Sequence, residues 1–145
     1  MHGQTQRTLA ARARHRIVHA SVLAGLLLFA AVTLYLSGRA SGSARSESAT
    51  VLMKYVGLVV LAGSMLAVML FRPRISAPRA GGDLDDWWLS NSRYVTSLWA
   101  LADAGGLACV VLGWLTQDNT LLVSGVVVAV LLLLWCRPGS LEARR

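Results

Sequence analysis

Charged residues are scarce in this chain of 145 amino acids. Asp, Glu, Lys and Arg together make up only 14% of it, about half the share that is usual in a soluble domain. Acidic residues are the scarcest, with 7 Asp and Glu against 14 Lys and Arg, so the formal net charge is +7. This composition excludes a disordered or acidic chain, and together with 55% hydrophobic residues it argues against an ordinary soluble domain.

The sequence motifs of catalysis and metal binding are also missing. The two cysteines, Cys109 and Cys136, stand in apolar runs without the spacing of a zinc or redox site. His15 and His19 share a helical face, but no third metal ligand is near, so we expect them to face solvent or lipid phosphates. No Ser-His-Asp order, phosphate-binding glycine loop or pair of catalytic carboxylates is present. The sequence therefore predicts no enzymatic activity, no cofactor and no bound metal.

Four long stretches with few or no charged residues are the main feature that the chain does have. A helix crosses a hydrocarbon core of about 30 Å with about 20 residues, and each stretch is near that length. A helix also satisfies its own backbone hydrogen bonds in lipid, which an isolated strand does not. We therefore predict an all-α integral membrane protein, a four-transmembrane-helix bundle made of two antiparallel hairpins, with helices at about 17–37, 51–71, 94–116 and 120–136.

The basic residues are divided unevenly between the two sides of such a bundle. Eleven of them lie before the first helix, in the middle loop or after the last helix, whereas only Arg39, Arg45 and Lys54 lie on the other side. Cytoplasmic loops carry the excess of Lys and Arg, so both termini are predicted to be cytoplasmic. The expected location is the inner membrane of a bacterium, and the expected partners of the arginines are anionic lipids on its cytoplasmic side, not nucleic acid.

These expectations divide the chain into three parts. They are a basic cytoplasmic N-terminal segment, a membrane domain and a basic cytoplasmic tail, over residues 1–16, 17–136 and 137–145, with a cytoplasmic loop at 72–93. An alternative is that residues 1–40 act as a cleaved secretory signal, which would leave three helices. The apolar run there is much longer than the usual 7–15 residues of such a signal.

The middle loop ends in an acidic and aromatic segment that precedes the third helix. Acidic residues suit the start of a helix, because they cap its free N–H groups and face its positive end. We expect a short interfacial helix that begins near Asp83 or Asp85, anchors its tryptophans at the membrane surface and leads into the third helix. The alternative function of this segment is a docking patch for a partner protein, made of Asp83, Asp85, Asp86, Trp87 and Trp88.

Small residues predict where the helices pack. Lipid gives little hydrophobic drive for helix association, so close contacts at small side chains matter more than in water. The third helix has Gly105, Cys109 and Gly113 at intervals of four residues, which forms one such face. The loop that follows is minimal, about Gln117 to Asn119, and predicts a tight hairpin with the fourth helix.

Asp103 is the one acidic residue within a predicted transmembrane helix. Asp at the centre of a membrane helix costs about 2.5–3.5 kcal/mol on insertion scales, and such residues usually face a bundle interior and mark a function. At about 100° per residue, Asp103 lies roughly opposite the face of Gly105, Cys109 and Gly113. Possible hydrogen-bond partners are Ser64, His19 or a group on another protein.

Three functions remain open from the sequence. The first is a small non-enzymatic inner-membrane protein, an accessory or structural subunit of a larger membrane complex that it contacts through its helix faces. The second is a small oligomeric transporter or channel with Asp103 as its proton or cation site. The third is a holin-like pore former, since such proteins are also small, helical and basic at their ends. The expected protein partners are other membrane subunits or further copies of the chain.

Overall fold

The chain is almost entirely helical. The computed structural model describes residues 2–38, 47–78 and 82–143, and describes side chains from residue 13 onward. In these ranges there are no strands, and the elements are α1 (His2–Ser37), α2 (Glu47–Phe71), the 3-10 turn η1 (Arg72–Arg74), α3 (Leu84–Thr116), α4 (Asn119–Trp135) and α5 (Pro138–Glu142).

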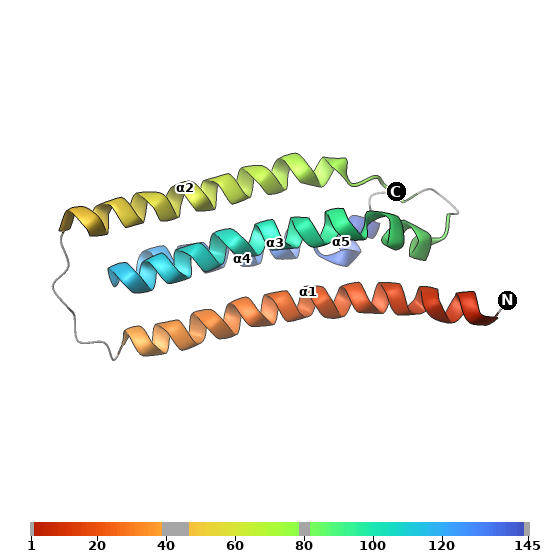
Figure 1. The fold of residues 1–145 in the computed structure, drawn as a ribbon, viewed down its shortest axis with the longest axis horizontal. Coiled ribbons are helices and arrows are strands. Elements are labelled where there is room, and N and C mark those ends of the chain that lie inside the picture. The colour runs from red at the N-terminus through yellow and green to blue at the C-terminus, as the bar shows by residue number, and fades with distance from the viewer. Residues whose placement is uncertain (1, 39–46, 79–81, 144–145) are drawn as a thin grey trace.

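The helices form a bundle around α3. In Figure 1, α3 runs between α1 and α2, with α4 behind it, and the helices follow the long axis of the molecule. Helix α3 packs against α1, α2 and α4, whereas α1 and α2 hardly contact each other within the described ranges. Helix α5 lies against α1 at the end of the bundle where α1 begins. We call that end the inner end, and the opposite end the outer end.

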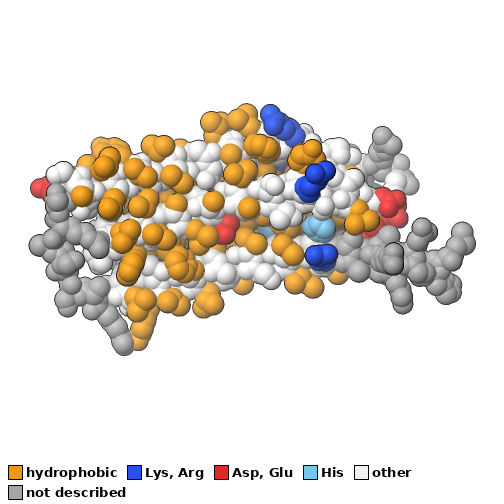
Figure 2. Space-filling view, viewed as in Figure 1, with side chains coloured by type: hydrophobic (Ala, Val, Ile, Leu, Met, Phe, Trp, Pro, Cys, Tyr) orange, Lys and Arg blue, Asp and Glu red, His pale blue; other side chains and the backbone are white. Residues whose placement is uncertain are grey.

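Three helices are long and apolar enough to cross a membrane. The three candidate spans are Ala13–Ser37, Glu47–Arg74 and Leu84–Thr116. Helix α4 is a shorter apolar helix of 17 residues. Large apolar side chains cover the outside of the bundle: Leu28, Val59 and Leu131 are 68%, 70% and 60% exposed. Figure 2 shows such side chains along the visible face between its two ends. A soluble monomer rarely exposes an apolar surface of this extent, so the fold has the surface of a membrane protein.

Two helices begin about ten or more residues earlier than the sequence predicted, and α2 begins at Glu47 instead of 51. Helix α1 already starts at His2 instead of 17, and α3 starts at Leu84 instead of 94, so that the last part of the predicted loop 72–93 is helical. In α3 the reason is a continuous buried face: Trp88, Asn91 and Val95 follow each other at helical spacing and are all buried. The predicted interfacial helix is therefore the first part of α3, without an interruption.

The turn between α3 and α4 is short and well capped. Gln117 takes a left-handed conformation with φ 55°, and the N–H groups of Gln117 and Asp118 donate to Trp114 O and Gly113 O. This is the Schellman arrangement, which satisfies the last carbonyls of a helix. The side chain of Asp118 then caps α4 by accepting from the N–H groups of Thr120 and Leu121, so the chain reverses direction within two residues.

The three small residues of α3 lie at its contacts with two neighbours. A Cβ atom at Gly105 would lie 2.7 Å from Ser64 Oγ of α2, and one at Gly113 would lie 2.8 Å from Leu122 N of α4. Cys109 is fully buried, and its Sγ is 3.5 Å from the carbonyl oxygen of Gly57 in α2. Both neighbouring helices therefore approach the backbone of α3 too closely for larger side chains at these positions.

Candidate functional site

Two histidines and two tryptophans form a cluster near the inner end of the bundle. The ring of His15 stacks on Trp88 with a centroid distance of 4.8 Å, and the ring of His19 meets Trp99 edge-on at 5.0 Å. His19 is buried, and its Nε2 donates to the carbonyl oxygen of Leu133, 3.0 Å away in α4. The histidines therefore bind α1 to α3 and α4. The expectation that the pair faces solvent or lipid phosphates is wrong for His19, whereas His15 is half-buried against Trp88.

The tryptophans of this cluster also bind the end of α4 and α5. Trp99 Nε1 donates to Cys136 O over 2.8 Å, and Trp88 Nε1 donates to Glu142 Oε1 over 3.1 Å. The first bond satisfies a carbonyl at the C-terminal end of α4, where carbonyls have no partner inside the helix. The inner end is therefore a packed, hydrogen-bonded structure that joins α1, α3, α4 and α5.

The acidic and aromatic segment has a structural role at the start of α3. Asp83 caps the helix, because its side chain accepts from Asp85 N over 2.9 Å. Trp87 is buried and its Nε1 donates to Ser76 O over 2.7 Å, which fixes the chain after η1 onto α3. Trp88 is fully buried, and Asp86 is exposed. The two rings are covered by the chain itself, so they do not offer an exposed patch to a partner.

Asp103 lies near the middle of α3, far from both ends of the helix. It follows Trp99 by four residues, about 6 Å along the helix, and precedes the outer end at Thr116 by about 20 Å. Its side chain is partly buried. Its Oδ1 is inaccessible to solvent, and it has no hydrogen-bond partner among the described residues. In Figure 2, acidic atoms lie at both ends of the visible face and also at its middle.

Neither predicted partner of Asp103 is bonded to it. His19 donates to Leu133 O, and Ser64 is buried against Gly105 on the other side of α3. Of the four residues that neighbour Asp103 on the helix surface, three or four positions away, Trp99 and Gly106 are buried, Leu107 is half-buried and Ala100 is exposed. The carboxyl group thus lies at the border between the packed part of α3 and a strip of α3 that no described helix covers.

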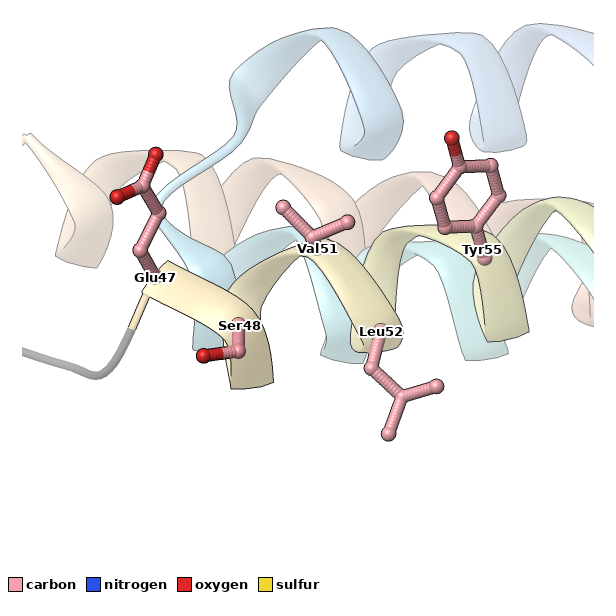
Figure 3. A pocket seen from close by; sticks show the side chains of 5 residues that line it. All are labelled: Glu47, Ser48, Val51, Leu52 and Tyr55. Atoms are coloured by element: carbon pink, nitrogen blue, oxygen red, sulfur yellow. The ribbon is translucent and has the colours of Figure 1, made fainter.

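At the outer end, the side chains that line a hollow do not converge on one point. A shallow hollow of about 500 Å³ is lined by Glu47, Ser48, Val51, Leu52 and Tyr55. All five belong to the first turns of α2, and Figure 3 shows that they point to different sides of this single helix. In the described part of the chain, no three His, Cys, Asp or Glu side chains are placed to hold a metal ion. The expected lack of a cofactor and of enzymatic activity stays a prediction.

An ion pair joins α2 to the turn between α3 and α4. Lys54 Nζ lies 2.8 Å from Asp118 Oδ2, a contact that the sequence analysis did not foresee. The hydrogen bond from Lys54 holds the pKa of Asp118 below its ordinary value, and the N–H groups of Leu121 and Thr120 act in the same direction. The carboxylate therefore has two tasks, as the cap of α4 and as the partner of α2.

Because of this ion pair, we expect a small part of the free energy of unfolding to depend on pH. A carboxylate with a lowered pKa stabilises the fold fully above the unfolded value of about 3.9, and this contribution is lost as the pH falls through the folded value. Because Lys54 is 43% exposed, we expect Lys54→Met to cost only about 0.2–1 kcal/mol at pH 7. Thermal melts of both proteins at pH 7 and pH 3 should show a difference that shrinks in acid. A difference that is constant over this range would contradict the role of Asp118.

Comparisons with protein-family models, with curated proteins and with solved structures find no match to this chain.

Proposed function

We propose that this chain is a small non-enzymatic subunit that stabilises or regulates a larger membrane complex, and that it contacts that complex through the face of α3 that carries Asp103. The observation that carries the proposal is the buried Oδ1 of Asp103, which has no hydrogen-bond partner among the described residues and lies at the edge of an exposed strip. An unsatisfied carboxyl group within a membrane is costly, and a donor supplied by a neighbouring helix would remove that cost.

The residues around Asp103 support a helix as the neighbour. Thr96, Ala100 and Ala104 are exposed on the adjoining strip of α3, and all three are small. Small side chains allow a second backbone to approach closely, and Ser or Thr hydroxyls can form hydrogen bonds across the contact. Within the described ranges, α1 and α2 each pack against α3 and hardly contact each other, so they do not close over the exposed strip.

The proposal includes a placement in the membrane. All four long helices cross it, both termini lie on the cytoplasmic side, and the membrane is the cell membrane of a bacterium. Support comes from the eleven basic residues assigned to one side against three on the other. Among the side chains that Figure 2 colours, the visible basic ones lie nearer the inner end.

Substitutions at Asp103 and Ala104 test the proposed contact. Asp103→Asn keeps the shape and a hydrogen-bonding group, so the complex should survive, whereas Asp103→Leu should weaken it about three- to tenfold because a hydrogen bond is lost. Ala104→Leu should weaken it as well, because it adds bulk to an exposed position without disturbing the chain's own packing. The measurement is the particle mass and subunit content of the tagged protein purified from its native membrane in mild detergent.

The matched control is Ala62→Leu, which adds the same bulk to an exposed position of α2. It should leave the complex unchanged. A wild-type protein that purifies without other subunits contradicts the proposal. A homo-oligomer whose proton or cation flux is abolished by Asp103→Asn would instead establish the transporter.

A further inference from the structure

A groove between α2 and α4 is a second feature of the surface, separate from Asp103. It has a volume of about 240 Å³ and is lined only by apolar and aromatic side chains, those of Met65, Val128, Leu131, Leu132 and Trp135. Both helices run from the outer to the inner end, so the groove follows their common direction. From Val128 to Trp135 it extends over seven residues, about 10 Å. Its length is two helical turns, too short to seat a transmembrane partner helix.

A positive charge stands at the inner end of this groove. Arg72 follows Met65 by seven residues, and its guanidinium lies over the ring of Trp135, 4.0 Å from the ring centre. Such a cation–π contact bridges α2 and α4 and holds the charge beside the last lining residue. Arg74, in the same 3-10 turn, lies over the ring of Phe71 at 5.0 Å. Tryptophan rings at helix ends lie at the level of the lipid headgroups, so Arg72 is placed at that level too.

We propose that this groove binds one acyl chain of an anionic phospholipid, with the headgroup phosphate paired to Arg72. The apolar lining suits a hydrocarbon chain that enters from the headgroup level and runs toward the bilayer centre, parallel to the helices. The planar guanidinium suits a phosphate, which it can contact with two parallel N–H groups. A zwitterionic lipid carries its own cation beside the phosphate, so the charge of Arg72 favours a lipid with net negative charge.

Lipid retention by the purified protein tests this site. The full chain in neutral detergent is mixed with phosphatidylglycerol or with phosphatidylcholine of identical acyl chains, and bound lipid is counted by native mass spectrometry. The wild type should retain the anionic lipid about fivefold better, the effect of one arginine near an anionic surface. Arg72→Gln should remove this preference, and Arg72→Lys should restore most of it because the charge returns.

Two matched controls separate a site from general attraction. Arg16→Gln removes an exposed charge from α1, which hardly contacts α2 within the described ranges, and should lower the preference much less than Arg72→Gln does. Leu131→Trp fills the groove and should lower retention of both lipids, whereas Val127→Trp adds the same ring to a position of α4 outside the groove and should not. Far-UV circular dichroism melts confirm that each variant is folded before lipid is counted.

Three results would overturn the proposal. They are equal retention of the two lipids by the wild type, an effect of Arg72→Gln no larger than that of Arg16→Gln, or unchanged retention after Leu131→Trp. None of these results depends on a partner complex, so this test and the test of Asp103 fail independently.

Discussion

Replacing Gly125 by leucine is expected to separate α3 from α4 and to cost about 3 kcal/mol or more of stability. A Cβ atom at Gly125 would overlap the Cβ of Cys109 and lie 3.0 Å from its Sγ. One helical turn away the contact is equally close, because a Cβ atom at Gly106 would lie 2.5 Å from the Cβ of Ala129. Neither helix can yield by a side-chain rotation, because the atoms that collide are next to the backbone.

The size of this effect follows from the solvent. In a bilayer, close van der Waals contact replaces the hydrophobic effect as the main drive for helix association. Forcing the two helices apart at Gly125 therefore removes the main attraction between them, and only the turn at 117–118 and the bond from Trp99 to Cys136 still join their two ends. The measurement is the thermal or denaturant-induced unfolding of the purified protein in detergent, followed by tryptophan fluorescence. Trp99 reports on this pair, because its Nε1 is bonded to Cys136 at the end of α4.

Gly63→Leu is the matched control for this substitution. Gly63 lies on α2, and a Cβ atom there would meet nothing within 4 Å. The same change in side-chain volume should therefore be tolerated, with a change in stability within about 0.5 kcal/mol. Equal effects of the two substitutions would show that helix propensity, and not the close approach of α3 and α4, decides the outcome.

The local signals in the sequence were informative about helix ends. Asp83 begins α3 and the turn at 117–118 ends it, because capping residues and the minimal loop act through their immediate neighbours. The early start of α3 was also readable: Trp88 and Trp99 are eleven residues apart, three helical turns, and Asn91 and Val95 lie between them on one face. The start at about 94 was predicted from the charged residues that border the apolar stretch. Such residues mark where a helix leaves the hydrocarbon core, and not where the helix begins.

The neighbours of the candidate residues could not be predicted in the same way. Asp103 was identified because a charge in an apolar helix is visible in the sequence, but the position of Ser64 and His19 depends on how α1 and α2 are rotated about their own axes. Both helices are apolar nearly all round, so hydrophobic periodicity does not fix that rotation. It is fixed by contacts distant in sequence, such as His19 with Leu133 and Gly105 with Ser64.

Reporter fusions are expected to show that α4 crosses the membrane although it has only 17 residues. Its length of about 26 Å is slightly below the usual 30 Å, so length alone would also allow a helix that lies on the surface. The contacts at its two ends favour the crossing. Its start follows the turn at the outer end, whereas its last turn is bonded to His19 and to Trp99 near the inner end.

A reporter that is active only outside the cytoplasm should therefore be active after Asn119 and inactive after Gly82 and after Ala143. A reporter that fluoresces only in the cytoplasm should give the opposite pattern at each position. The expected difference is between activity and none, because α4 either carries the C-terminal end back across the bilayer or does not. An external signal after Ala143 would refute the four crossings. An internal signal after Asn119 would reverse the orientation inferred from the arginines, and would move Arg72 and its groove to the outer leaflet.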